Sequence, residues 1–335
     1  MKTLDKGSFV LSLDTELAWG AVHHGSYAGR ESDFAATRFV IDEILRLCEK
    51  YEIKATWAVV GHLFLSSCQP ENGVKHPEIK RPQYPGFQGD WFHRDPCSDV
   101  HTEPWWYGPD IIRKLLACPV PQEVGSHNFS HVIIGASGCD GEVFSSELMA
   151  AKRAAGPWGI ELKSFVYPRN AIGFTEVLRD HGFTSYRGAS PDWTYRLPGP
   201  MRRGARFLDA FRPGTAPVVH PKYEDGIWNI PASYNYLHRS GWGRLVPVGV
   251  RVRKSVNALR KAARSGGVFH MWTHPFNIAS DSRGLLAGLE SIFQEVRSLR
   301  ESGLISSVTM SELTQALEAE RRESGISARE MELAQ

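Results

Sequence analysis

Short apolar runs alternate with amphipathic segments along most of the chain. The run over residues 8–13 is rich in strand-forming residues, and residues 54–61 form a second such run. Between them Asp33 suits a helix N-cap, and apolar side chains follow it at helical spacing: Val40, Ile41, Ile44, Leu45 and Leu47. This strand–helix–strand order predicts that the two strands pair in parallel.

The alternation continues to the end of the sequence. Further strands are expected at 123–125, 163–167, 185–187, 226–231, 267–273 and 305–309. Further helices are expected at 109–116, 142–155, 174–181, 285–299 and from 311 onward. Residues 251–264 carry many Lys and Arg residues among apolar ones, which indicates a helix with a solvated basic face or a helix facing acidic lipid or phosphate.

Two regions break the alternation. Residues 65–109 are rich in Pro, Gly, His and aromatic residues, and residues 190–221 are rich in Pro, Gly and Arg. A long structureless stretch inside a compact domain is usually functional. We therefore predict a single domain over residues 1–335, with an inserted loop at 65–109 that covers a site and an irregular segment at 190–221. The alternative for the insert is a loop that merely packs on the barrel wall.

Composition narrows the class of protein. The chain has 335 residues, of which 42% are hydrophobic and 23% charged, as in globular domains. The net charge of +2 is too small to argue for a nucleic-acid partner. The five cysteines show no C-x-x-C spacing, which indicates free thiols. With no bilayer-length apolar run and no signal-peptide core before residue 8, we expect a cytoplasmic protein without a transmembrane segment.

Candidate chemical groups follow the predicted strands at their carboxyl ends, where barrels of parallel strands carry their chemistry. These residues are Asp14, Glu16, His127, His131, Arg169 and His274. His127 and His131 stand four residues apart, so on a helical turn their imidazoles could hold one divalent ion, although two surface or capping histidines are the alternative. Asp14 and Glu16 are two residues apart in an extended segment and point the same way.

One carboxylate and two histidines form a ligand set that leaves metal positions open for water and substrate. The second carboxylate is then free to deprotonate the attacking water, and a histidine on the far wall could protonate a leaving amine. Together these residue types are the ones that metal-assisted amide hydrolysis requires.

Five motifs of the chain resemble those of the polysaccharide deacetylases, the NodB-like carbohydrate esterases. The motifs are LSLDTE at 11–16, ATWAVVG at 55–61, EVGSHNFSH at 123–131, YPRN at 167–170 and WTH at 272–274. They keep the family's order, and the histidine block is the most specific of them. The resemblance implies an α/β fold, a distorted and incomplete (β/α)7 barrel. It also implies one divalent metal ion, commonly zinc, with cobalt, nickel, manganese and iron as alternatives.

The resemblance also implies roles for individual residues. His127 and His131 look like metal ligands, Asp14 like the catalytic base and His274 like the general acid. The family's adjacent Asp-Asp appears here as Asp-Thr-Glu, so Glu16 is expected to be the carboxylate ligand, or the two carboxylates share their roles.

Arg169 lies in the motif that orients the catalytic Asp, although the usual Arg-x-Pro-aromatic order is changed to YPRN. Asn170 in the same motif is a candidate substrate contact. The aromatic wall of the site is expected from Trp193 or Trp228. The insert, whose rings include Trp105 and Trp106, is expected to supply a sugar-contacting surface.

We therefore expect a hydrolase that removes an N-acetyl or N-formyl group from a sugar in surface-polysaccharide or O-antigen biosynthesis. The expected partner is an N-acylated sugar or a lipid- or nucleotide-linked saccharide, and peripheral membrane contact is left open. Two alternatives are an allantoinase-like hydrolase acting on a small non-sugar amide and a non-catalytic carbohydrate-binding relative.

Overall fold

A computed structural model describes residues 6–24, 31–191, 214–236 and 245–333, with the isolated residues 201, 205, 210, 211 and 243. Its strands are β1 (Gly7–Thr15), β2 (Thr56–Val59), β3 (Glu123–Ser126), β4 (Ser164–Val166), β5 (Ser185–Gly188), β6 (Lys222–Glu224), β7 (Ile227–Pro231), β8 (Tyr234–Asn235), β9 (Val268–Thr273) and β10 (Ile305–Ser307). The short strands β6 and β8 were not expected from the sequence.

The described α-helices lie between these strands or after β10, and all but α7 are near positions expected from the sequence. They are α1 (Glu31–Tyr51), α2 (Pro109–Ala117), α3 (Gly141–Ala155), α4 (Thr175–Asp180), α6 (Val248–Ser265), α7 (Pro275–Ala279), α8 (Ser282–Glu301) and α9 (Met310–Leu333). Short 3-10 helices add η1 (Leu17–His24), η2 (Gly61–Phe64), η3 (Gly156–Trp158) and η4 (Pro168–Asn170).

The strands form one sheet in the order β6-β7-β5-β4-β3-β2-β1-β9-β8, and β10 also pairs with β1. Every pairing between these strands is parallel except that of β6 with β7. β7 pairs with β5, and after only two more residues β8 pairs with β9. One stretch of chain thus joins both ends of the sheet. It completes an irregular barrel from β1, β2, β3, β4, β5, β7–β8 and β9, which confirms the predicted distorted (β/α)7 barrel.

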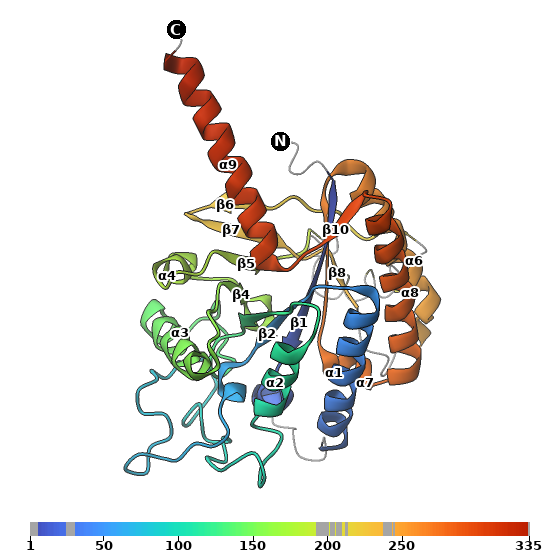
Figure 1. Ribbon diagram of the computed structural model, residues 1–335. Helices are drawn as coiled ribbons and strands as arrows, with labels where there is room; N and C mark the ends of the chain where they lie inside the picture. Colours follow the sequence, from blue (N-terminus) through green and yellow to red (C-terminus); the bar gives the residue numbers. More distant parts are fainter. Residues whose placement is uncertain are drawn as a thin grey trace.

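Helices surround the barrel. In Figure 1, α8 packs against both α1 and α6 on one side, α3 and α4 lie on the other, and α9 extends away from the body. All nine residues of β1 are buried, as expected of a strand paired on both edges and covered on both faces. The buried apolar side chains of β1 and β9, Phe9 and Phe269 among them, join those of α1 and α8 in one core.

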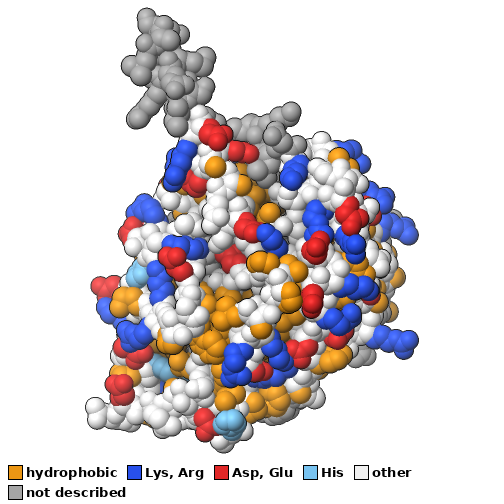
Figure 2. All heavy atoms as spheres, viewed as in Figure 1, with side chains coloured by type: hydrophobic (Ala, Val, Ile, Leu, Met, Phe, Trp, Pro, Cys, Tyr) orange, Lys and Arg blue, Asp and Glu red, His pale blue; other side chains and the backbone are white. Residues whose placement is uncertain are grey.

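The basic segment at 251–264 forms most of α6. Arg251 and Lys254 are buried, and Arg260 pairs with Glu295 of α8 at 2.7 Å. Figure 2 shows positive and negative side chains interspersed over the face it presents. These contacts favour a helix packed on the barrel over one that presents its basic side chains to acidic lipid. None of the helices in the described part of the chain combines the length and apolar character that a membrane span requires.

The insert contains no helix or regular strand within residues 65–108, as its composition predicted. It packs at the end of the barrel where β1, β2 and β3 finish: Trp91 Nε1 donates to Ser130 Oγ at 2.9 Å, and the Ala18 amide donates to the Trp105 carbonyl at 3.1 Å. The large rings Trp91, Phe92, Trp106 and Tyr107 are at most 1% exposed. These rings anchor the irregular segment by burying apolar area. They do not form the open sugar-binding surface that was expected of them.

Candidate active site

Two carboxylates lie at the carboxyl end of β1. Leu13 pairs with Thr273, so His274 emerges from β9 directly beside them. His274 Nε2 lies 3.7 Å from Asp14 Oδ2 and 3.2 Å from Glu16 Oε1. Asp14 and Glu16 are both buried, at 3% and 5% exposure. Both carboxylates therefore face the same imidazole, as expected from their spacing of two residues.

The two histidines of the EVGSHNFSH motif follow β3. The expected helical turn between them is wrong, because Asn128 (φ 51°) and His131 (φ 61°) have left-handed backbone conformations. The irregular turn nevertheless brings both imidazoles to one oxygen: His127 Nε2 and His131 Nε2 each lie 3.1 Å from Glu16 Oε1. The structure thus brings together the three residues that the sequence suggested as metal ligands.

Glu147 of α3 holds this turn in place. Its buried carboxyl group accepts hydrogen bonds from the amides of Phe129 (2.9 Å) and Ser130 (2.7 Å), and from Ser130 Oγ (2.5 Å). The amide of Gly61, the first residue of η2, adds a hydrogen bond to the Asn128 carbonyl at 2.7 Å. Nothing in the sequence distinguishes Glu147, because an acidic residue within an amphipathic helix is usually solvent-exposed.

Replacing Glu147 with alanine is expected to weaken metal binding by roughly 10–100-fold, the range typical of groups that orient metal ligands. The turn would lose three hydrogen bonds, and His127 and His131 would no longer be held at one oxygen. Competition with a chromophoric chelator measures the change. Glu142→Ala on the same helix is the matched control, since the Glu142 side chain is exposed and pairs with Lys80 at the surface. Equal affinities in the two variants would show that Glu147 does not position the ligands.

The geometry around Glu16 fits a divalent transition metal. His127 Nδ1 lies 2.7 Å from the Val166 carbonyl, so it carries the proton and leaves the Nε2 lone pair directed at Glu16. The candidate ligand atoms of Glu16, His127 and His131 all lie within 4.8 Å of one another. In a tetrahedral shell with metal–ligand bonds of about 2.0–2.1 Å, neighbouring ligand atoms stand roughly 3.3 Å apart. The observed 3.1 Å separations are close to that value.

Arg187 of β5 holds Asp14, a role that the sequence did not reveal. Its Nη1 and Nη2 donate to the two carboxylate oxygens at 2.6 and 2.7 Å, and its guanidinium carbon lies 4.3 Å from the Trp272 ring centroid. Nη1 also donates to Ser12 Oγ at 3.1 Å. Burial would raise the pKa of Asp14, but the Arg187 charge lowers it below its usual range. In the sequence, the feature that could have indicated this role is the position of Arg187 at the carboxyl end of a predicted strand.

Arg169, expected to orient Asp14, occupies a different place. It lies in η4 with a positive φ of 56° and its side chain is exposed, and Arg187 instead donates to both Asp14 oxygens. The orienting role expected of Arg169 is therefore corrected to Arg187. The neighbouring Asn170 does reach this network, since its Oδ1 accepts a hydrogen bond from Arg187 Nη2 at 3.2 Å.

The four tryptophans suggested for the substrate site differ in their surroundings. Trp228 of β7 is buried, and its Nε1 donates to Glu318 Oε1 at 2.6 Å. Trp106 is 1% exposed and packs edge-on against Trp19. The expectation that Trp106 contacts a sugar is therefore wrong. Trp105 is partly buried, near Phe34 and Arg38. Trp193 lies outside the described residues.

His274 is the most accessible member of the site, with 19% of its side chain exposed. Burial lowers its pKa, but the negative charges of Glu16 and Asp14 outweigh burial and raise the pKa above the usual value. His274 and His131 also change the pKa of Glu16. Burial would raise the Glu16 pKa, yet these imidazoles hold it well below its usual range.

No protein-family model matches the sequence, and no curated protein matches it. Solved structures do match. A protein described as a polysaccharide deacetylase from Mycobacterium smegmatis aligns with a TM-score of 0.64 at 14% identity, over 95% of this chain and 92% of that one. The PuuE allantoinase aligns with a TM-score of 0.58 at 12% identity, over 94% and 92%.

A second protein described as a polysaccharide deacetylase, from Pseudomonas aeruginosa PAO1, aligns with a TM-score of 0.56 at 12% identity, over 92% of this chain and 91% of that one. At such low identity these likenesses concern the fold, and they extend over almost the whole chain. The protein therefore has the fold of the polysaccharide deacetylases, as its five motifs predicted.

Proposed function

We propose that this protein is a metal-dependent hydrolase that removes an N-acyl group from a sugar. The observation that carries the proposal is the position of Glu16 Oε1, which lies 3.1–3.2 Å from the Nε2 atoms of His127, His131 and His274. Asp14, held by Arg187, lies beside them. Glu16, His127 and His131 would hold one divalent ion, for which zinc suits the nitrogen and oxygen donors best.

Such an ion, when bound, supplies Lewis-acid polarisation of a carbonyl group and increases the acidity of water. Asp14 and His274 accept and donate the protons of the reaction. Asp14 takes the proton of the attacking water, because the Arg187 charge keeps its carboxylate ionised and both oxygens retain lone pairs. His274 stays protonated beside the two carboxylates and gives its proton to the leaving amine. The amide bond is cleaved, and the acyl group leaves as a carboxylic acid.

The proposed substrate is an N-acetylated or N-formylated sugar, free or linked to a lipid or nucleotide, from surface-polysaccharide or O-antigen assembly. The sequence motifs and the fold shared with two proteins described as polysaccharide deacetylases support this class. Asn170 and Trp105, both partly exposed, are the substrate contacts that we retain from the sequence.

Hydrolysis of a small non-sugar amide is a second candidate, favoured by the likeness to an allantoinase over 94% of the chain. A panel of N-acetyl and N-formyl sugars, their nucleotide-linked forms and cyclic ureides, assayed with Zn²⁺, separates the two functions. We expect acetate or formate release from sugars. Turnover of the ureides alone would replace the sugar proposal with the second candidate.

His274→Ala is expected to lower kcat by roughly 10²–10⁴-fold, the typical contribution of one general acid, while metal content stays unchanged. His220→Ala is the matched control, because His220 is exposed and follows Val219, which pairs with the first residue of β9 at the opposite end of that strand. Steady-state kinetics and elemental analysis of both variants test this. Loss of the metal in His274→Ala protein would move His274 from the acid to the ligand set.

A further inference from the structure

A second cluster of potential ligands lies outside the active site. It combines His62 of η2 with Cys68, His76 and Asp95 of the insert, and their candidate ligand atoms all lie within 4.8 Å of one another. His62 and Asp95 are at most 1% exposed, and His76 is 8% exposed. None of these residues takes part in the chemistry proposed above.

The separations between these atoms suit a tetrahedral shell. His62 Nε2 lies 3.3 Å from Asp95 Oδ2 and 3.5 Å from Cys68 Sγ, and Cys68 Sγ lies 3.9 Å from both Asp95 oxygens. Around a zinc ion, neighbouring nitrogen and oxygen ligands stand roughly 3.3 Å apart, and pairs that include sulfur roughly 3.6 Å apart. His76 Nε2, at 2.8 Å from Asp95 Oδ2, would move outward by about half an ångström to join them.

Surrounding groups orient the ligands. His62 Nδ1 lies 3.0 Å from the Trp106 carbonyl, an arrangement that places the proton on Nδ1 and leaves Nε2 free to bind. The Cys97 amide donates to Asp95 Oδ1 at 2.9 Å, so one carboxylate oxygen is fixed while Oδ2 faces the histidines. The ring of Trp19 packs 4.6 Å from that of His62. Such an apolar wall lowers the local dielectric and strengthens binding of charged ligands to a cation.

Charge balance also favours a cation. Asp95 is buried and acidic, and Cys68 binds metals as the thiolate, so the pair brings two negative charges into the protein interior. Two neutral histidines and one divalent ion make that set neutral overall, which avoids the cost of burying uncompensated charge.

We propose that His62, Cys68, His76 and Asp95 form a second, structural metal site that takes zinc or a similarly thiophilic divalent ion. Four protein ligands leave no open position for substrate, which is the pattern of structural sites. The ion would tie three points of the insert to the start of η2, where β2 has just ended. A segment of more than forty residues without helix or strand would thereby be fixed to the barrel by a cross-link in addition to its buried rings.

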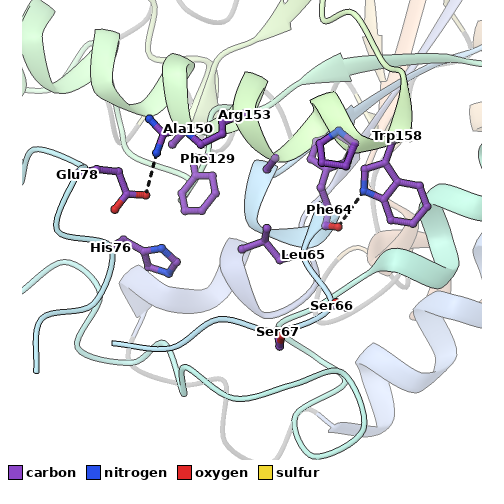
Figure 3. A pocket seen from close by; sticks show the side chains of 12 residues that line it. Phe64, Leu65, Ser66, Ser67, His76, Glu78, Phe129, Ala150, Arg153 and Trp158 are labelled. Carbon is purple, nitrogen blue, oxygen red and sulfur yellow. Dashed lines mark hydrogen bonds and ion pairs between the residues drawn. The ribbon is translucent and has the colours of Figure 1, made fainter. Parts of the chain in front are cut away.

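A cavity borders this site at His76. This cavity of about 500 Å³ lies between the insert and α3, and His76 forms part of its wall together with Phe129, Glu78 and Arg153 (Figure 3). Figure 3 shows the His76 side chain at this cavity, near those of Glu78 and Phe129. An ion could therefore reach the ligands without unfolding the barrel, one of the conditions for a workable metal site.

Cobalt substitution tests the proposal independently of activity. The full chain carrying His127→Ala and His131→Ala, which removes two ligands of the Glu16 site, is stripped of metal and titrated with Co²⁺. We expect one bound ion per chain and a near-ultraviolet charge-transfer band from a cobalt–thiolate bond, which the active site, lacking cysteine, cannot produce. Titration of Zn²⁺ into the cobalt form should abolish the band.

Single variants in the same background assign the ligand. Cys68→Ser should abolish the band, and Cys97→Ser should retain it, although Cys97 Sγ lies only 3.7 Å from Asp95 Oδ2. The reverse pattern, or the absence of the band in the parent protein, would overturn the assignment. Should the Cys68→Ser protein fail to fold, the titration of the parent protein and the Cys97→Ser variant still show whether a cysteine of this cluster binds the metal. Loss of sugar deacylation alone would bear on the proposed function and not on this site.

Discussion

Replacing Arg187 with methionine is expected to lower the free energy of unfolding by about 3–5 kcal/mol, the cost typical of stripping a buried charge of its partner. Arg187 is 1% exposed and donates two hydrogen bonds to Asp14, which is itself 3% exposed. Methionine has a similar length but no donor, so the Asp14 carboxylate would remain buried beside Glu16 without its main counter-charge. Activity should fall as well, since Asp14, the proposed general base, would lose both its ionisation and its orientation.

Chemical denaturation of the metal-free protein measures the stability change. Asp14→Asn added to Arg187→Met removes the orphaned charge and should recover much of the lost stability without recovering activity. Arg187→Lys is the conservative control, and it should be intermediate because one ammonium group cannot bind both carboxylate oxygens. If the double variant were no more stable than Arg187→Met, the loss would have to be attributed to packing against Trp272 rather than to charge.

Replacing His127 with alanine is expected to lower the affinity of the Glu16 site for zinc at least roughly 100-fold. Structural zinc sites of four ligands bind with apparent free energies of roughly 10–16 kcal/mol, so one ligand accounts for about 3 kcal/mol or more. Deacylation at limiting zinc should fall in proportion. His127 also lies 2.7 Å from the Val166 carbonyl, and its loss frees the end of β4 from the turn.

This experiment is best done in a Cys68→Ser background, so that zinc held by the insert does not enter the count. Zinc titration against a competing chelator gives the affinity, and His220→Ala again serves as the histidine control. Unchanged stoichiometry and affinity in the His127→Ala variant would remove His127 from the ligand set and with it the proposed function of the site.

The barrel and the positions of its main polar groups could be predicted from the sequence because both depend on local pattern. Apolar runs of strand formers mark β1 and β9, and residues that follow such runs must lie at the carboxyl end of a parallel barrel. Asp14 and His274 therefore meet despite the long sequence between them. Likewise, residue type and spacing placed Glu16 and His131 among the candidate groups, whereas the choice of Glu16 as the carboxylate ligand came from the family resemblance.

The partner of Asp14 could not be predicted in the same way. Arg187 reaches β1 from β5, which stands four strands away in the sheet order, and only the curvature of the barrel closes that distance. Arg169 was favoured because it lies in a motif. A short irregular turn with positive φ, however, allows no inference about side-chain direction.

The cluster around His62 could not be predicted from the sequence, for a related reason. Asp95 lies in a long irregular segment, where polar residues are usually exposed. In the structure it is buried against His62 and His76, residues that lie 33 and 19 positions before it in the sequence. No periodicity links such positions, and the irregular backbone between them decides which side chains converge.

The central place of β1 has a consequence for synthesis of the protein. β1 pairs with β2 and β10 on one edge and with β9 on the other, so the second edge of this nine-residue buried strand lacks its partner until residues 268–273 have been translated. Unpaired apolar strand edges are sites of aggregation. A ribosome that stalls before residue 268 would thus display a template for intermolecular pairing, and slow translation of the middle of the chain would lengthen the period in which nascent chains depend on chaperones.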